Sequence, residues 1–244
     1  MVAQSTSSLP SPPFWLQAEG WSQFPQLIHG FSSRVQDREK IRSQLQDTYG
    51  ELHTVKQVHG DEIIIVSQRT CQNVPVEADG MITGQVGRLL GIVTADCVPV
   101  LMVAPSHRVV AALHAGWRGT LKGITARALN RFVTFWKIRP EDVWVAIGPS
   151  IDPCCYEVDY EVGNALYEKW GKTNSETWRP EGEKGLLDLR TINLLQCKQA
   201  GVPLQQIQFV GPCTSCTSAL FSSYRREGVH ADRQLSIIGW QVVE

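Results

Sequence analysis

The chain contains 244 residues, of which 43% are hydrophobic and 19% are charged, and its formal net charge is -1. This composition is ordinary for a globular protein, and the length is sufficient for one large domain with a buried core. Because no basic stripe is visible, a nucleic-acid polymer is not the expected ligand, and a small molecule is favoured instead.

Residues 1–13, MVAQSTSSLPSPP, are rich in serine and proline and are predicted to form a disordered tail before a single domain over residues 14–244. They lack the basic start and apolar core of a signal peptide, and the longest apolar runs are too short to span a bilayer. These features predict a cytoplasmic protein. The seven cysteines, an odd number, then favour free, metal-binding or catalytic thiols over a disulfide framework.

Apolar and β-branched runs predict strands along most of the chain. Several of these runs are apolar at successive positions, as is typical of strands buried on both faces. The predicted strands are residues 27–31, 53–58, 62–66, 88–94, 98–103, 108–114, 142–147, 206–210 and 235–243.

Helices are predicted over fewer stretches, namely residues 37–48, 120–136, 157–170 and 188–200. In residues 120–136 apolar side chains recur at helical spacing, and Thr120 is placed as the N-cap. Gly201 follows the last helix as a C-terminal stop. Strands outnumber helices and alternate with them irregularly. We therefore predict an α/β fold of the mixed α+β kind, a single domain in which mixed β-sheets are covered by helices.

The stretch HAGWRG, residues 114–119, lies between the predicted strand 108–114 and the predicted helix 120–136. Its glycines permit a sharp turn and a close approach to a ligand. The first amides of the helix, together with Arg118, are suited to hold an anion such as phosphate. The alternative is an ordinary strand–helix connection with an exposed Arg118 and a packed Trp117.

Three possible metal ligands, His59, Cys97 and His114, each lie at the end of a predicted strand. Two imidazoles and one thiolate suit a zinc site with an open fourth position. A water in that position would have its pKa lowered to about 7 and would supply hydroxide. The alternative is two hydrogen-bonded histidines and a buried cysteine.

The motifs KQVHG, EADGMIT, VTADCVPVLM, ALHAGWRGT, AIGPSI, CCYEV and LFSSYRREG occur in this order along the chain. The series resembles the bacterial laccase-domain proteins, which were first labelled polyphenol oxidases and later described as metal-dependent purine nucleoside phosphorylases that also deaminate adenosine. The similarity runs from about residue 29 to the C-terminus. It implies that His59, Cys97 and His114 bind Zn2+, with Cu2+ as an alternative.

The same resemblance suggests further site residues. Arg34 is expected to contact substrate or phosphate, although VQDREK follows it where the family often has glycines. Gln57 can bind a base or fix a ligand, and Asp96 can act as an acid or base or orient a histidine ligand. Asp79 can do likewise. Arg34, Gln57 and Asp96 are thus the catalytic candidates, and Arg34, Gln57, Arg118 and Asp79 the substrate and phosphate candidates. For each of these residues the alternative is a structural hydrogen bond.

Four cysteines fall in two short motifs, CC at 154–155 and CTSC at 213–216. A CxxC motif can bind a metal or cycle between thiol and disulfide, but no second CxxC accompanies this one. We therefore expect ordinary thiols near the wall of the active site, with one of Cys154 and Cys155 packed and the other partly exposed. The roles of Cys154, Cys155, Cys213 and Cys216 are left open, as is the direction of Arg225 and Arg226.

The resemblance implies a zinc-dependent purine nucleoside phosphorylase that converts adenosine, inosine and related nucleosides such as methylthioadenosine to the base and ribose 1-phosphate, with adenosine deaminase activity. The partners would be a nucleoside and phosphate, without a membrane or nucleic acid, in a monomer or homodimer.

Three other functions stay open. One is a copper-dependent phenol oxidase, for which six histidines are few. Another is a cysteine hydrolase with Cys97 as nucleophile and His114 as base. The last is a scaffold with structural zinc, which would need a fourth protein ligand.

Overall fold

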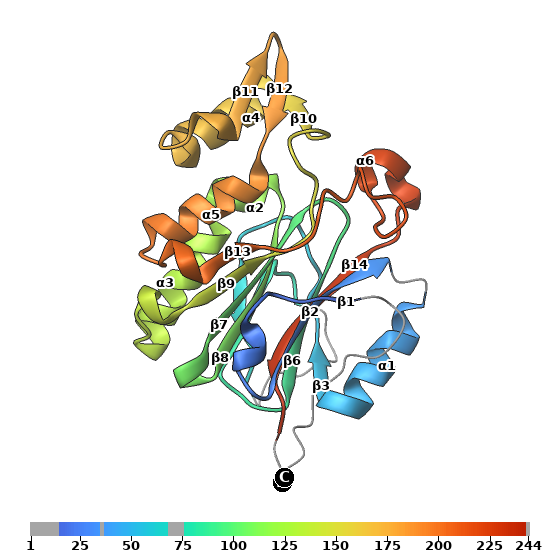
Figure 1. Cartoon of the computed structure of the whole chain (residues 1–244), viewed down its shortest axis with the longest axis vertical. Helices are drawn as coiled ribbons and strands as arrows, with labels where there is room; N and C mark the ends of the chain where they lie inside the picture. Colours follow the sequence, from blue (N-terminus) through green and yellow to red (C-terminus); the bar gives the residue numbers. More distant parts are fainter. Residues whose placement is uncertain (1–14, 35–36, 68–75, 243–244) are drawn as a thin grey trace.

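Two large β-sheets are stacked face to face, with helices against both outer faces (Figure 1). The computed structural model describes residues 15–34, 37–67 and 76–242. The arrangement confirms the predicted α/β fold, with mixed sheets covered by helices. The tail predicted for residues 1–13 lies outside the described residues, as does Cys71.

The first sheet has five strands in the order β1 (Trp15–Leu16), β2 (Leu27–Arg34), β14 (Gln234–Trp240), β6 (Arg88–Thr94) and β3 (Glu51–His53). The second has six strands in the order β13 (Ile207–Phe209), β9 (Trp144–Ile147), β7 (Val98–Ala104), β8 (Val109–Ala115), β5 (Gly80–Thr83) and β4 (Ile63–Ile65). Both sheets are mixed, because β3 and β6, β4 and β5, and β9 and β13 pair in parallel while the other pairs are antiparallel.

A smaller sheet of three strands projects from one end of the molecule together with the helix α4 (Tyr160–Leu166) (Figure 1). Its strands follow the order β10 (Glu157–Asp159), β12 (Lys184–Leu187) and β11 (Trp178–Glu181).

The central strands β7 and β8 are buried on both faces, as their continuous apolar sequences predict. Because side chains alternate along a strand, Val100 and Met102 face the helices whereas Leu101 and Val103 face the other sheet. These two strands therefore contribute to two separate cores. The core between the sheets also contains Phe31, Met81, Leu90 and Ile238.

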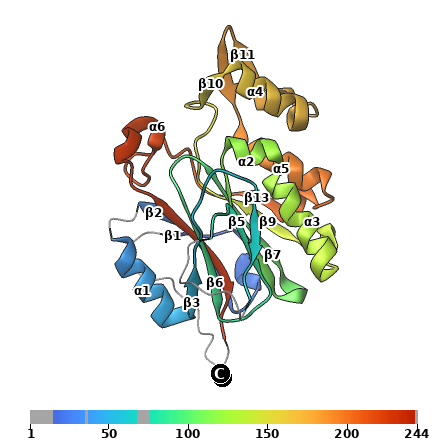
Figure 2. The same ribbon diagram turned by 180° about the vertical axis from the view of Figure 1, so that it is seen from behind.

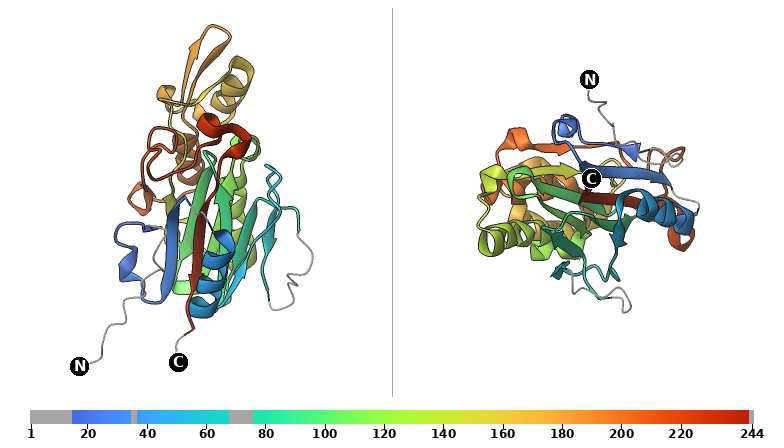
Figure 3. Two further views of the ribbon diagram at one scale, coloured as in Figure 1. Left: turned by 90° about the vertical axis from the view of Figure 1, so that its right-hand side faces the viewer. Right: turned by 90° about the horizontal axis from the view of Figure 1, so that it is seen from below.

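Helices cover the outside of the stack on both sides (Figures 2 and 3). On one side α1 (Arg38–Tyr49) packs Ile41 and Leu45 against the five-stranded sheet. On the other side α3 (Ile124–Trp136) and α5 (Leu189–Gln199) cover the six-stranded sheet. The short helices α2 (Trp117–Lys122) and α6 (Tyr224–Glu227) complete the set of α-helices in the described part of the chain. None of the helices among these residues has the length and apolar character needed to cross a membrane.

The helix predicted over residues 120–136 is two helices in the structure. The first begins at Trp117 with Gly116 as N-cap, so Thr120 lies buried inside it and is not the cap. Gly123, at φ +89°, separates the two helices. A Cβ at this position would lie 2.7 Å from a ring carbon of Trp170, a tertiary contact that the local sequence does not reveal.

Two other predicted elements are corrected by the structure. The strand predicted over 53–58 ends at His53, and Gln57 lies in the loop beyond it. The segment 157–170, predicted as one helix, contains three elements in the structure. It begins with the strand β10, continues as α4 and ends in a π-helical turn over Tyr167–Gly171. The short strands β1, β5, β11 and β12 were not predicted, because runs of two to four residues carry too little periodicity.

Acid should destabilise the fold through His29. This side chain on β2 is 3% exposed, and its Nε2 accepts a hydrogen bond from the amide of Ala18 at 3.0 Å. Burial lowers its pKa from 6.5 to about 4. Because the folded pKa lies below the unfolded one, the unfolded chain binds the extra proton between these values. The contribution of His29 is therefore complete above pH 6.5 and falls by on the order of 3 kcal/mol as the pH drops towards 4.

Urea unfolding at a series of pH values measures this effect. The variant His29→Gln should show a shallower loss of stability across the window, whereas His230→Gln, at an exposed histidine, should follow the wild type. Equal slopes in all three proteins would contradict the assignment to His29.

Candidate functional site

Three side chains from distant parts of the sequence meet at one end of the stacked sheets. The potential ligand atoms of His59, Cys97 and His114 all lie within 4.8 Å of one another. The two imidazole rings stand edge to face, with centroids 4.8 Å apart and an interplanar angle of 80°. His59 is exposed, Cys97 is half-buried and His114 is 3% exposed, so the cluster opens towards solvent on the His59 side.

The topology explains why these residues meet. His59 lies in the connection from β3 to β4 and Cys97 in the connection from β6 to β7, so each lies where the chain crosses from the five-stranded to the six-stranded sheet. The antiparallel pairing of Val98 with Ala115 places the start of β7 beside the end of β8. Cys97 and His114 therefore share one edge of the six-stranded sheet.

The carboxylate of Asp79 organises the cluster. One oxygen, Oδ1, lies 2.7 Å from Nδ1 of His114 and accepts the amide of His59 at 2.9 Å. The other, Oδ2, accepts the amides of Gly60 at 2.6 Å and Val58 at 3.2 Å. Because Nδ1 of His114 is held by a carboxylate, its Nε2 is the nitrogen left for a metal or substrate.

The fully buried Asp79 stays ionised for a specific reason. Burial alone would raise the pKa of the carboxyl, but the hydrogen bonds from His114 and the amide of Gly60 outweigh it and lower the pKa. The same hydrogen bonds fix His59 at φ +60°, in the left-handed region that is costly for a residue with a Cβ. Asp79 thus stabilises the strained turn at His59 and also fixes the orientation of the His114 ring.

Gly116 and Gly119 lack a Cβ at positions where one would crowd neighbouring atoms of the cluster and its turn. Gly116 has φ -69°, which any residue can adopt, but a Cβ there would lie 3.2 Å from both Cys97 Sγ and His59 Cδ2. A Cβ on Gly119 would lie 2.5 Å from the carbonyl oxygen of Gly60. The HAGWRG stretch therefore brings α2 into close contact with the cluster and with the turn that carries His59.

The electrostatics favour a thiolate at Cys97. Burial would raise the pKa of this thiol, but hydrogen bonds with His114 and His59 lower it to about 6. Burial would lower the pKa of His114, but Asp79 and Cys97 raise it to about 9. This pKa leaves His114 protonated at neutral pH, and a metal ion would have to displace that proton. One thiolate and two imidazoles would then be available, and these match the donors that zinc and copper accept. In the described part of the chain, no fourth protein ligand joins this cluster.

The cluster forms part of the wall of a cavity of about 650 Å³, a size suited to a small molecule. The cavity is lined by Val55, Gln57, His59, Val93, Thr94, Ala95, Asp96, Cys97, His114, Trp117, Arg118, Ile151, Tyr156, Leu189, Tyr224, Arg225 and Arg233. Aromatic faces, apolar side chains and three guanidinium groups thus surround the candidate metal ligands.

The structure places Asp96 and Asp79 in different roles. Asp96 is 7% exposed and accepts hydrogen bonds from the Thr214 hydroxyl at 2.6 Å, the Ser223 hydroxyl at 2.9 Å and the amide of Arg225 at 2.7 Å. These bonds tie together two loops of the cavity wall. The carboxylate that orients His114 is Asp79, so of the two aspartates considered for this role, Asp79 has it and Asp96 does not.

Gln57 lines the cavity, but its side-chain amide pairs with the backbone. Its Nε2 donates to the carbonyl of Val93 at 2.7 Å, and its Oε1 accepts the amide of Val93 at 2.8 Å. Gln57 therefore fastens the loop before His59 to β6, and the alternative of a structural hydrogen bond describes this geometry.

Arg118 and Arg34 are placed differently as well. Arg118 lines the cavity, with its guanidinium 4.2 Å from the centroid of the Trp117 ring. Arg34 is not among the cavity-lining residues. Its guanidinium donates to the carbonyls of Ser218 and Phe221 and pairs with Glu227 at 3.5 Å.

Four aromatic or charged lining residues were not among the predicted site residues: Tyr156, Tyr224, Arg225 and Arg233. The motifs CCYEV and LFSSYRREG contain the first three, so the resemblance carried a signal for them. Burial raises the pKa of Tyr156, with Cys97 adding to the shift, so its hydroxyl stays protonated at neutral pH. Arg226, next to Arg225, points elsewhere and donates to the carbonyls of Thr214 and Ser215.

Fold and site together define an α/β protein with two large stacked sheets, whose ligand cavity is bordered by a candidate metal centre of two histidines and one cysteine. Residues 32–241 match the family model described as multi-copper polyphenol oxidoreductase laccase. The chain belongs to this family.

Curated relatives in this family are named as nucleoside phosphorylases. The purine nucleoside phosphorylase YlmD of Geobacillus stearothermophilus is 41% identical over 193 residues, covering 75% of this chain and 70% of the relative. The purine nucleoside phosphorylase CA_C1699 of Clostridium acetobutylicum is 34% identical over 75% of both chains. These names support membership of a nucleoside phosphorylase family of enzymes.

Solved structures confirm the fold. The crystal structure of YlmD from Geobacillus stearothermophilus superposes with a TM-score of 0.84 at 31% identity, covering 96% of this chain and 99% of that one. The Bacillus licheniformis hypothetical protein YfiH gives a TM-score of 0.85 at 28% identity, covering 95% and 98%.

The variant Asp79→Asn tests the organising role of the carboxylate. In either orientation of the new side-chain amide, its NH2 group would face N–H groups that donate to the Asp79 carboxylate in the wild type. These N–H groups would lose their hydrogen-bond acceptor. We expect a loss of about 2–5 kcal/mol in the free energy of unfolding.

Urea unfolding of wild type, Asp79→Asn and Glu77→Gln measures this loss. Glu77 is a matched control, because its exposed carboxylate lies two residues away and pairs only at the surface with Lys56 at 2.7 Å. A variant at Asp79 as stable as the one at Glu77 would contradict the role assigned here.

Proposed function

We propose that this chain is a metal-dependent purine nucleoside phosphorylase in which His59, Cys97 and His114 hold Zn2+. The substrates are adenosine, inosine and related nucleosides such as methylthioadenosine, and adenosine is also deaminated. The observation that carries the proposal is the His–Cys–His cluster in the wall of a cavity that also presents aromatic rings and guanidinium groups. The names of the relatives support the same reaction.

Phosphorolysis requires a site for an anion beside a slot for a base. A phosphate oxygen forms a bond to C1′ of the ribose while the bond from C1′ to the purine nitrogen breaks. The electron pair of that bond goes to the purine, which takes up a proton, and the products are the base and ribose 1-phosphate. Arg118, Arg225 and Arg233 are the cavity residues suited to phosphate, because guanidinium groups bind it bidentately.

The base would bind among the aromatic residues. Trp117 presents a ring for stacking, and the neutral hydroxyl of Tyr156 can donate a hydrogen bond to a purine nitrogen. When bound, zinc would supply Lewis acidity and a water of lowered pKa, about 7, which suits the deamination of adenosine. With a metal bound, Asp79 would keep the proton of His114 on Nδ1 and leave Nε2 as the ligand atom.

The variant Cys97→Ala should lose both zinc from this cluster and phosphorolysis, because two imidazoles alone hold zinc weakly. We expect inosine phosphorolysis to fall at least about 100-fold. Chromatography of reactions with adenosine and inosine, with and without phosphate, measures base, ribose 1-phosphate and inosine separately.

Cys197→Ala is the control, since this cysteine lies on the buried face of α5 in the core and does not line the cavity. If wild type binds zinc at this cluster but converts no nucleoside, the proposed reaction is wrong. Activity that survives in Cys97→Ala would exclude this cysteine from the reaction.

The variant Arg118→Ala tests the phosphate site. Removing a guanidinium from the cavity should raise the KM for phosphate by about 10-fold or more and leave the KM for inosine nearly unchanged. Arg139→Ala serves as the control, because Arg139 is exposed, pairs with Asp142 and does not line the cavity. An unchanged phosphate KM in Arg118→Ala, together with a raised one in Arg34→Ala, would assign phosphate to Arg34 instead.

A cysteine hydrolase is the second candidate, and one observation favours it. Cys97 has a lowered pKa and interacts with His114, as a thiol nucleophile with its base would. Stoichiometric zinc on the thiolate would exclude this function. A copper oxidase of phenols is less well supported, because in the described part of the chain only one possible metal cluster contains histidine.

A further inference from the structure

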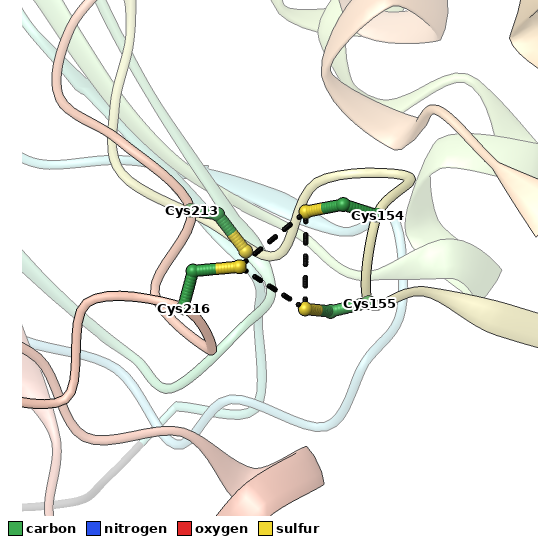
Figure 4. Close-up of side chains that lie close together, drawn as sticks. All are labelled: Cys154, Cys155, Cys213 and Cys216. Atoms are coloured by element: carbon green, nitrogen blue, oxygen red, sulfur yellow. Dashed lines mark hydrogen bonds between the residues drawn. The ribbon is translucent and has the colours of Figure 1, made fainter.

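Four cysteines converge at a second place in the molecule (Figure 4). Cys154 and Cys155 lie in the loop after β9, and Cys213 and Cys216 lie in the loop after β13. Because β9 and β13 pair in parallel, the two loops leave the sheet at the same edge. The two motifs that looked unrelated in the sequence are therefore neighbours, and their sulfur atoms point towards one another.

The sulfur atoms have the spacing of metal ligands. Sγ of Cys154 lies 3.8 Å from that of Cys155 and 3.5 Å from that of Cys216, and the latter two sulfurs are 3.3 Å apart. All four lie within 4.8 Å of one another. Four sulfurs bound tetrahedrally to zinc, at about 2.3 Å each, lie about 3.8 Å apart. A disulfide would instead need a separation of about 2.05 Å.

We propose that Cys154, Cys155, Cys213 and Cys216 together bind one Zn2+ ion, at a second site distinct from the His59–Cys97–His114 cluster. Four thiolates select a soft or borderline cation over magnesium or calcium, and the tetrahedral arrangement suits zinc. Since the protein supplies all four ligands, no position is left for a reacting water. The site is structural, and it does not depend on the proposed function.

The surroundings suit a site of this charge. Four thiolates around Zn2+ carry a net charge of -2, and two arginines are attached to the same loops. Arg225 donates to the carbonyl of Cys155, and Arg226 donates to the carbonyls of Thr214 and Ser215. The amide of Asp152 also donates to Sγ of Cys213 at 3.4 Å. Cys154 and Cys216 are exposed, so the ion can reach the site from solvent.

The ion would join two loops that shape the cavity. Tyr156, which lines the cavity, directly follows Cys155. Thr214, between the two cysteines of the CTSC motif, donates its hydroxyl to Asp96 at 2.6 Å. Zinc at the four cysteines would hold the loop after β9 against the loop after β13, and so fix the positions of Tyr156 and, through Thr214, of Asp96 in the cavity wall.

Metal analysis of the purified full-length protein, kept in a reducing buffer with zinc and then desalted, tests the proposal. Three variants are compared with the wild type: Cys154→Ser/Cys216→Ser, which replaces the two exposed ligands, Cys97→Ala, and the buried-cysteine control Cys197→Ala. The four-cysteine site predicts that Cys154→Ser/Cys216→Ser holds one zinc fewer per chain than the wild type, whereas Cys97→Ala keeps one zinc. If the other cluster binds no zinc, the wild type holds one, and Cys97→Ala still retains it.

Cobalt substitution gives a second readout that does not use activity. A cobalt ion with four thiolates should give intense charge-transfer and visible bands in Cys97→Ala, and these bands should be absent from Cys154→Ser/Cys216→Ser combined with Cys97→Ala. Chelation of zinc should lower the Tm of Cys97→Ala by several degrees and leave the combined variant unchanged.

Two results would overturn the proposal. One is equal zinc content in the wild type and in Cys154→Ser/Cys216→Ser. The other is peptide mapping that finds Cys216 disulfide-bonded to Cys154 or Cys155 in the protein as purified from cells, with no zinc bound there.

Discussion

The candidate metal centre depends on the hydrogen bonds of one buried carboxylate. Asp79 accepts the amides of Val58, His59 and Gly60 and holds Nδ1 of His114. Burying a charged carboxylate is costly, and four donors offset that cost. Because one group makes all four bonds, the turn carrying His59 and the ring of His114 are positioned relative to each other and not separately. The same turn packs closely against α2, where a Cβ on Gly119 would lie 2.5 Å from the carbonyl oxygen of Gly60.

Much of the framework was predictable from apolar runs, whereas the assignment of the carboxylates was not. The strands β6, β7 and β8 were predicted nearly to their ends, which placed Cys97 and His114 at strand boundaries. Asp79 and Asp96 could not be distinguished, since both precede apolar strands. Only the register that pairs Gly80 with Leu113 shows which of them reaches His114. Local sequence equally could not show that a distant tryptophan packs on Gly123.

Arginines were the hardest residues to assign, because a long side chain does not reveal its direction in sequence. Arg225 and Arg226 are adjacent, yet the first lines the cavity and the second binds loop carbonyls. Arg34, at the end of β2, forms an ion pair with Glu227 and donates hydrogen bonds to the carbonyls of Ser218 and Phe221. Its role therefore depends on the segment over residues 217–227, a loop followed by α6, which is far away in the sequence.

The position of His59 and Cys97 in the two crossings between the sheets has a consequence for folding. Because these two residues lie in crossings between the sheets, they come together with His114 only when the five-stranded and six-stranded sheets are docked, so the cluster requires long-range contacts. An ion bound there would favour the docked state over any state with the sheets apart, by thermodynamic linkage. Metal binding would then occur only in chains whose sheets have docked, and the ion would hold the two stacked sheets together at one end.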